Sequence, residues 1–320
     1  MARIKLKVVV LFFVGMFFLG NSIIAQTDIS LITHSFTRAS YNPAAIARPN
    51  YLYLFSSARS QWNGVSGSPV VINVQASQFF QSMNSAFGFS LVSDKIGVSQ
   101  VINPMFTYAF KIESNREWSL SMGLSAGFFS RDFNGTKFEP VEINDPSINY
   151  DVERILRPDA NVGFEVQTSH FIFGASSTHL FAIMKPENLF LASNHRYAYA
   201  MYKQNNIELF NYNVGMQMVN RNNLTVLEGS ANIRFKHATG LSSGAREIFD
   251  LGMTYRSSKQ MTFMLGINLF NDFRVGYAYN QSFNTGYTTN TTHEIMLELR
   301  IFSHSSSTGE LGQKDEFWYH

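Results

Sequence analysis

The sequence predicts an all-β protein, a transmembrane antiparallel β-barrel of the outer-membrane type with about 14 strands. Three observations support this fold: one strongly alternating segment, the repetition of its pattern along the chain, and the composition. Charged residues make up 15% of the 320 residues and aromatic residues another 15%, while the mean hydropathy is close to zero. Barrel strands give this combination, because only one face of each strand meets lipid.

The segment from Trp118 to Phe128 shows the alternation most clearly. Its even-numbered positions are all apolar, and its odd-numbered positions are all Ser or Gly. A period of two indicates a β-strand with unlike faces, and the segment is about as long as a tilted strand needs to cross a bilayer. A face of Ser and Gly suits a crowded or watery barrel lumen better than an ordinary solvent-exposed surface.

Residues 1–25 are predicted to form a secretory signal peptide. Arg3, Lys5 and Lys7 form its basic region, residues 8–19 form its apolar core, and a cleavage site precedes Gln26. A membrane anchor is the alternative, but the apolar run is short for a spanning helix. The chain has no cysteine, which excludes a lipoprotein anchor and a disulfide framework.

The positive charge of the chain belongs to this N-terminal segment. The whole sequence has a formal charge of +2, whereas the part after residue 25 has 22 basic and 23 acidic residues, a charge of −1. This balance does not indicate a nucleic-acid partner.

Residues 26–50 are predicted to be a periplasmic lead-in with turn chemistry, because Tyr41-Asn42-Pro43-Ala44 and Pro49-Asn50 break any strand pattern. The barrel is predicted to span residues 51–302. Its candidate strands lie near residues 51–60, 69–79, 85–93, 101–112, 118–130, 161–168, 171–177, 195–203, 207–219, 224–236, 249–256, 261–270, 274–280 and 293–302. Twelve or sixteen strands remain open, since boundaries carry an error of a few residues.

The predicted connections alternate in length, as they do in outer-membrane barrels, where periplasmic turns are short and external loops are long. Residues 81–84, 113–117 and 204–206 would be periplasmic, and residues 131–160 and 178–194 external. Residues 237–246 are long for a periplasmic turn, which leaves the strand register there uncertain. Residues 303–320 are expected to form a hydrophilic C-terminal tail.

Ionisable residues within the strands are expected to point inward, because they would be costly on the lipid face. The lumen is then either a polar conduit or, as we favour, a space filled by a salt-bridged network. The ionisable residues expected to point inward are Lys111, Glu165, Glu228, Arg234, Lys236, Asp250, Arg256, Glu298 and Arg300. The long loop 131–160 carries charges of both signs but matches no calcium-loop pattern, so solvated loop charge is favoured over a cation site.

The sequence indicates no enzyme, no cofactor and no bound metal. The eight histidines lack a metal-ligand spacing such as H-E-x-x-H, and Gly64-Val65-Ser66-Gly67 follows no nucleotide-binding pattern. A Ser–His pair across neighbouring strands stays open as an outer-membrane hydrolase hypothesis, with His179 and His293 as its candidates. It requires a Ser or Asp within hydrogen-bonding distance of one of them.

Short motifs along the chain carry a family resemblance. The early ones are Asn42-Pro43-Ala44, Arg59-Ser60-Gln61-Trp62-Asn63-Gly64 with Gly67 and Pro69, Phe87-Gly88-Phe89-Ser90 and Asp94-Lys95-Ile96-Gly97. The later ones are Pro158-Asp159, Gly163, Gly174-Ala175-Ser176 with His179-Leu180, Thr254-Tyr255-Arg256, Arg274-Val275-Gly276-Tyr277-Ala278-Tyr279 and His293-Glu294-Ile295-Met296-Leu297. In this order the sequence resembles the PorP/SprF family of outer-membrane proteins of type IX secretion and gliding motility.

The resemblance implies a non-enzymatic barrel in the outer membrane of a Gram-negative bacterium. Its expected partners are membrane lipid, a secreted surface protein with a type IX C-terminal sorting domain, and periplasmic machinery or peptidoglycan-linked components. The alternative function is a passive outer-membrane channel or a hydrophobic-substrate transporter. A channel needs a lumen that is open along its length, whereas a docking barrel can be plugged.

Overall fold

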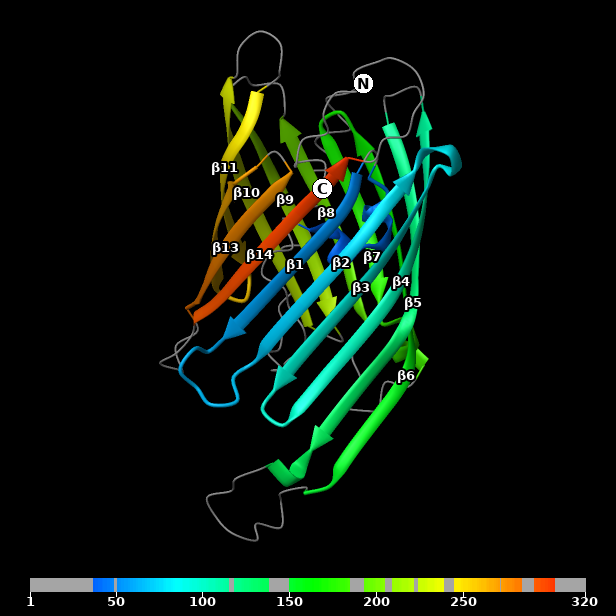
Figure 1. Cartoon of the computed structure of the whole chain (residues 1–320), viewed down its shortest axis with the longest axis vertical. Coiled ribbons are helices and arrows are strands. Elements are labelled where there is room, and N and C mark those ends of the chain that lie inside the picture. The colour runs from blue at the N-terminus through cyan, green and yellow to red at the C-terminus, as the bar shows by residue number, and fades with distance from the viewer. Residues whose placement is uncertain are drawn as a thin grey trace.

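The computed structural model describes residues 37–48, 51–114, 118–137, 150–184, 193–204, 209–221, 224–238, 245–270, 272–283 and 291–302. These residues form a closed barrel of fourteen antiparallel strands, as the sequence predicts (Figure 1). The strands are β1 (Tyr51–Gln61), β2 (Val70–Phe80), β3 (Ser85–Ile96), β4 (Ser99–Ser114), β5 (Trp118–Asn134), β6 (Val152–Thr168), β7 (Phe171–Thr178), β8 (His195–Gln204), β9 (Phe210–Arg221), β10 (Leu224–Ala238), β11 (Ala245–Arg256), β12 (Gln260–Asn268), β13 (Phe273–Ser282) and β14 (Thr291–Phe302).

Each strand pairs with its sequence neighbours, and β1 pairs with β14 to close the barrel. The closing seam is in register along the full length of β1, from Tyr51↔Phe302 to Gln61↔Thr292. Closure is required because an open sheet edge in hydrocarbon would leave backbone N–H and C=O groups unpaired. Among the described residues, no helix has the length and apolar character needed to cross a membrane.

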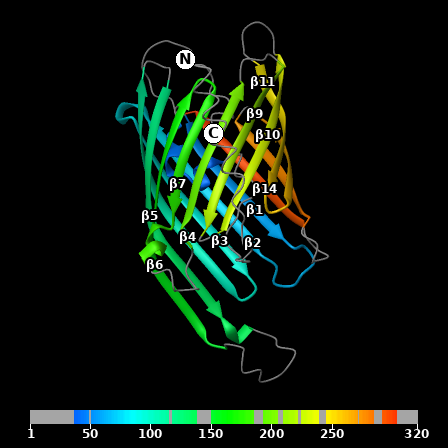
Figure 2. The same ribbon diagram turned by 180° about the vertical axis from the view of Figure 1, so that it is seen from behind.

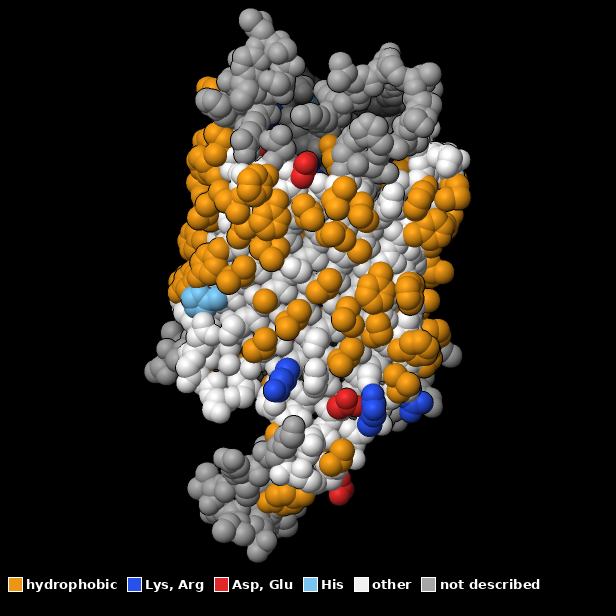
Figure 3. Space-filling model, in the orientation of Figure 1, with side chains coloured by type: hydrophobic (Ala, Val, Ile, Leu, Met, Phe, Trp, Pro, Cys, Tyr) orange, Lys and Arg blue, Asp and Glu red, His pale blue; other side chains and the backbone are white. Residues whose placement is uncertain are grey.

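The two faces of β5 point as the sequence predicts. Ser121 and Ser125 are buried inside the barrel, whereas Leu124 and Phe128 on the other face are 54% and 55% exposed. Other strands repeat this pattern, and Figure 3 shows that hydrophobic side chains form a broad belt around the visible wall. The outward belt is the surface that lipid covers.

The two ends of the barrel differ in their connections. The start of β1 and the end of β14 lie together at one end, where short connections join β2 to β3, β4 to β5 and β6 to β7 (Figures 1 and 2). The opposite end carries the longest hairpin, β5–β6. By the usual asymmetry of such barrels, the end with the long hairpin is the cell exterior.

Strands extend into both ends of two expected loops. Residues 131–160 are not one irregular external loop, because β5 continues to Asn134 and β6 begins at Val152. The expected connection 237–246 is shortened in the same way, since β10 reaches Ala238 and β11 starts at Ala245. The register between these two strands shifts at Phe235/Lys236, which is a local irregularity of the ladder.

Five short 3-10 helices complete the described structure: η2 (Arg38–Ser40), η3 (Pro43–Ile46), η4 (Gln81–Met83), η5 (Gly135–Lys137) and η6 (Leu180–Met184). Three of them follow strands as parts of connections. The first two belong to the segment that precedes the barrel in sequence, and their position determines what fills the lumen.

Candidate functional site

Residues 37–48, which we call the lumen segment, lie inside the barrel. Helix η3 packs against the inner faces of β4, β5 and β6, and Figure 1 shows this blue segment enclosed by the strands. Ten of its twelve residues are buried, including Asn42 at 0%, Arg38 at 1% and Ala44 at 1% exposure. The expectation of a periplasmic lead-in is therefore wrong for residues 37–48, while residues 26–36 and 49–50 lie outside the described residues.

Local sequence chemistry shapes the lumen segment. Asn42 caps η3, because its side-chain Oδ1 accepts a hydrogen bond from the Ala44 backbone N–H at 3.0 Å. Pro43 occupies the first helical position, where its missing N–H costs no hydrogen bond. The Arg48 guanidinium then donates to the Ala45 carbonyl at 2.9 Å and closes the turn. Asn42-Pro43-Ala44 therefore starts the short helix η3, which packs inside the barrel.

A buried ion pair ties the lumen segment to the wall. The Arg38 Nε donates to the Glu165 carboxylate on β6 at 2.8 Å, and both side chains are 1% exposed. The same carboxylate accepts hydrogen bonds from the Tyr199 hydroxyl and, at 2.6 Å, from the Gln167 amide. A buried charge pair with its remaining lone pairs satisfied is costly to break, because either partner alone would stay desolvated.

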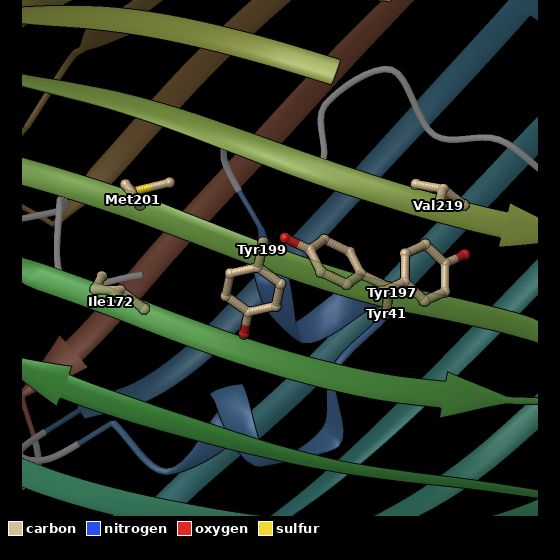
Figure 4. Close-up of a cluster of buried hydrophobic side chains, with 6 residues drawn as sticks. All are labelled: Tyr41, Ile172, Tyr197, Tyr199, Met201 and Val219. Carbon is tan, nitrogen blue, oxygen red and sulfur yellow. The ribbon is translucent and has the colours of Figure 1, made fainter. Parts of the chain in front are cut away.

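Tyr41 and Asn42 join the segment to β6, β7 and β8. The Asn42 amide donates to the Phe164 carbonyl at 3.0 Å and to the Tyr199 hydroxyl at 2.7 Å. Ser176 donates to the Tyr41 carbonyl at 2.7 Å. The Tyr41 ring lies beside Tyr197 and Tyr199 in a buried cluster (Figure 4), with centroids 5.0 and 5.6 Å away. Hydrogen bonds and aromatic packing therefore both hold Tyr41 and Asn42 against the barrel wall.

The small inward residues of the wall make room for the segment. A Cβ atom on Gly123 would lie 2.6 Å from the Pro43 carbonyl oxygen, and one on Gly163 would lie 3.0 Å from Asn42 Cγ. Real Cβ atoms essentially never come closer than 3.0 Å to other atoms, and the Asn42 Oδ1 atom would lie within that limit of a Gly163 Cβ. The Ser and Gly face of β5, which suited either a crowded or a watery lumen, packs against residues 37–48 at Gly123.

A second network of charges covers the opposite inner wall. Arg274 on β13 pairs with Asp250 and, at 3.2 Å, with Glu298, and Arg234 on β10 pairs with Glu247 at 3.1 Å. Glu298 also accepts from the Tyr53 hydroxyl. Arg48 of the lumen segment lies over the Tyr53 ring, 4.5 Å from its centroid. The network thus continues from the wall to the lumen segment.

Most of the inward ionisable residues predicted from the sequence lie in ion pairs. Seven of the nine are buried: Glu165, Glu228, Arg234, Asp250, Arg256, Glu298 and Arg300. Glu228 and Arg256 pair with each other at 2.9 Å, while Lys111 pairs with the exposed Glu113 at 2.6 Å. This burial matches the favoured salt-bridged lumen. Between Tyr41 and β9–β11 there is a cavity of about 20 Å³, enough for about one water molecule.

His179 and His293 lie at different places and have different partners. The His179 Nδ1 is 2.7 Å from the Asp159 carboxylate, which also accepts from the Asn103 amide at 3.0 Å. The His293 Nδ1 is 2.6 Å from the Tyr277 hydroxyl on the outward surface. The hydrolase hypothesis requires a Ser or Asp within hydrogen-bonding distance of one of these histidines, and Asp159 meets this requirement at His179. Within the part of the chain that the structure describes, no group of three or more His, Asp or Glu could hold a metal ion.

Together, the closed barrel, its apolar belt and its polar interior define the class as an integral outer-membrane β-barrel protein. Residues 23–299 match the model of the family described as type IX secretion system membrane protein PorP/SprF, and the chain belongs to this family. The comparison with curated proteins gave no match.

Solved structures with similar folds include three outer-membrane barrels. The TodX monoaromatic hydrocarbon channel deltaS2 mutant has 9% identity, covers 82% of this chain and 93% of its own, and gives a TM-score of 0.47. Omp33 of Acinetobacter baumannii has 7% identity, with 79% and 98% coverage and a TM-score of 0.47. The CymD monoaromatic hydrocarbon channel has 11% identity, with 87% and 94% coverage and a TM-score of 0.47. Similarity at this level carries no information about function.

Proposed function

We propose that this barrel is a non-enzymatic part of type IX secretion that helps to export or anchor a cell-surface protein of the adhesin or motility type. It also docks periplasmic components of the machinery, including peptidoglycan-linked ones. Family membership supports the secretion role. The burial of residues 37–48 in the lumen supports docking, because a barrel filled by its own chain offers its rims to partners instead of a conduit.

The two rims suit different partners under this proposal. The exterior rim carries the long β5–β6 hairpin, which would meet the exported protein and its type IX C-terminal sorting domain. The periplasmic rim carries short connections and the start of β1, and would meet the secretion machinery. The apolar belt between the rims meets membrane lipid.

The Asp159–His179 pair is better explained as a structural contact than as half of a catalytic triad. Asn103 bonds Asp159 and also donates to the Phe128 carbonyl at 2.9 Å, so the pair joins β4, β5 and β6 to the start of η6. We expect the purified protein to leave p-nitrophenyl esters intact. Ester hydrolysis that His179→Ala abolishes would contradict this assignment and support the hydrolase hypothesis.

Affinity capture tests the proposed function. The protein is epitope-tagged, expressed in its own outer membrane and extracted in a gentle detergent. The proteins that co-purify with it are identified by mass spectrometry. The same tag on an unrelated outer-membrane barrel is the control. Specific recovery of a surface protein with a type IX sorting domain, or of periplasmic machinery, supports the proposal. Recovery of the barrel alone, together with clear conductance in a planar bilayer, would favour the passive channel or hydrophobic-substrate transporter.

A further inference from the structure

The outer half of β6 pairs with a strand on one side. β5 pairs with β6 from Trp118↔Thr168 to Asn134↔Val152, whereas β7 pairs with it between Val162 and Gln167. Within the described ranges, no strand lies against Val152–Asn161 on the side away from β5. Both ribbon views show the β5–β6 hairpin projecting beyond the other strands (Figures 1 and 2).

The part of this edge nearest the barrel is covered. β7 ends at Thr178, and His179, with a φ of 55°, turns the chain toward β6. The His179 N–H donates to Asn161 Oδ1 at 2.9 Å and its ring contacts Asp159, after which η6 packs beside β6. Among the described residues, the part of the edge without a neighbouring strand therefore lies beyond Pro158, toward Val152.

Backbone groups on this part of β6 point away from β5. The Gly135 N–H donates to the Asp151 carbonyl, so the backbone groups of Asp151 face β5. The Phe128 carbonyl accepts from Asn103 on β4, so Phe128 and its partner Pro158 do not hydrogen-bond to each other and the Pro158 carbonyl faces away from β5. Because these groups alternate along a strand, the N–H and C=O of Val152, Arg154 and Leu156 face away from β5. Pro158, which has no N–H, is in the same set, where a proline suits an edge.

This edge lies outside the hydrocarbon layer. Arg154 and Asp132 pair at 3.2 Å on the outward face, and their side chains are 75% and 46% exposed. Charged side chains on that face are costly within the bilayer, so they mark a level beyond it. Figure 3 shows charged side chains below the hydrophobic belt at this end of the barrel. The edge therefore lies beyond the hydrocarbon layer, on the side of the membrane where a cell-surface protein is found.

We propose that the β6 edge around Val152, Arg154 and Leu156 binds an extended segment of the exported surface protein as an added strand. This inference rests on the proposed function and gives the partner a site. The backbone groups supply hydrogen bonds, as in other cases of strand addition. Val152 and Leu156 are 67% and 61% exposed and would contact apolar side chains of the bound segment. Arg157 is exposed on the opposite face of β6 and favours an acidic residue on the matching face of the segment.

A second copy of the chain fits this edge less well. Two barrels in one membrane are related by an axis along the membrane normal, so both β6 strands run in the same vertical direction with opposite tilts. Barrel strands tilt by about 35–45°, so two such edges would cross and could not form a ladder. A flexible, extended segment of another protein meets no such restriction.

Arg154→Pro tests the inference, with Arg154→Ala as the matched control. Proline removes one outward N–H without removing a β5–β6 hydrogen bond, whereas alanine removes the side chain and keeps the backbone. In the tagged capture experiment, we expect Arg154→Pro to lower recovery of the type IX surface protein about 3- to 10-fold relative to Arg154→Ala. Heat-modifiable migration in gels checks that both barrels assemble.

The outcomes separate the two proposals. Equal recovery by Arg154→Pro and Arg154→Ala overturns the edge inference alone, and recovery of a second copy of the barrel through this edge overturns the choice of partner. If the wild type recovers neither a type IX surface protein nor machinery, the proposed function fails and this inference fails with it.

A labelling experiment gives an independent test if Arg154→Pro does not assemble. The chain has no cysteine, so Val152→Cys introduces a unique thiol. On intact cells, maleimide labelling should be at least about threefold lower when the exported protein is present than when its gene is deleted. Equal labelling in both strains would overturn the inference.

Discussion

Gly123→Ala should displace the lumen segment from its seat on β5. The new Cβ would lie 2.6 Å from the Pro43 carbonyl oxygen, whereas ordinary van der Waals contact begins at 3.4 Å. The atoms in the way are backbone atoms of a turn capped by Asn42, so no side-chain rotation relieves the overlap. The segment must move by at least about 0.8 Å or leave the wall.

Overpacking of this kind costs about 1–3 kcal/mol. Since 1.4 kcal/mol corresponds to a factor of ten, local opening of residues 37–48 should become about 5- to 150-fold more frequent. Gly229→Ala is the matched control, because a Cβ there meets no atom within 4 Å. Alanine is favoured over glycine within a strand by about 0.5–1 kcal/mol, so the control should be neutral or slightly stabilising.

Hydrogen–deuterium exchange with mass spectrometry measures this opening directly. Peptides covering residues 37–48 should exchange faster in Gly123→Ala than in the wild type or in Gly229→Ala, while peptides from β1 and β14 stay protected. Unchanged exchange of residues 37–48 would refute the packing argument. Equal loss of protection over the whole barrel would show global unfolding and would refute the local mechanism.

Three further substitutions test the energetics by urea titration in micelles. Glu165→Gln leaves the buried Arg38 without its opposing charge and should destabilise the barrel by about 3–5 kcal/mol; a loss below about 1 kcal/mol would contradict the buried pair. Asn42→Ala removes the hydrogen bonds to the Phe164 carbonyl and the Tyr199 hydroxyl and should cost about 1–3 kcal/mol, with no change expected if the segment were outside the lumen. Leu124→Arg places a charge on the lipid face and should cost about 2–4 kcal/mol, whereas a neutral result would argue that this face does not meet hydrocarbon.

The strands were predictable from sequence because their signal is local. Alternation with a period of two located all fourteen strands, although several ends differ by a few residues. The outer half of β6 was missed, because Glu153, Arg154 and Pro158 break the apolar alternation there. That half is a strand because β5 pairs with it along its whole length, which is a tertiary effect.

The lumen segment could not be placed from its own residues. Its polar and turn-forming residues have the composition of a solvated connection, and the partner of Arg38, Glu165, is 127 positions away in sequence. Two local signals did point in the right direction. Asn42-Pro43 has the chemistry of a helix start, and the Ser and Gly face of residues 118–128 leaves space that something must fill.

Planar-bilayer recording of the wild-type protein, purified from the outer membrane, tests the central claim most directly. We expect no stable conductance steps, because residues 37–48 and the Arg274 network occupy the lumen. Stable, ohmic steps of the size that an open barrel gives would contradict a lumen filled by its own chain and would favour a channel.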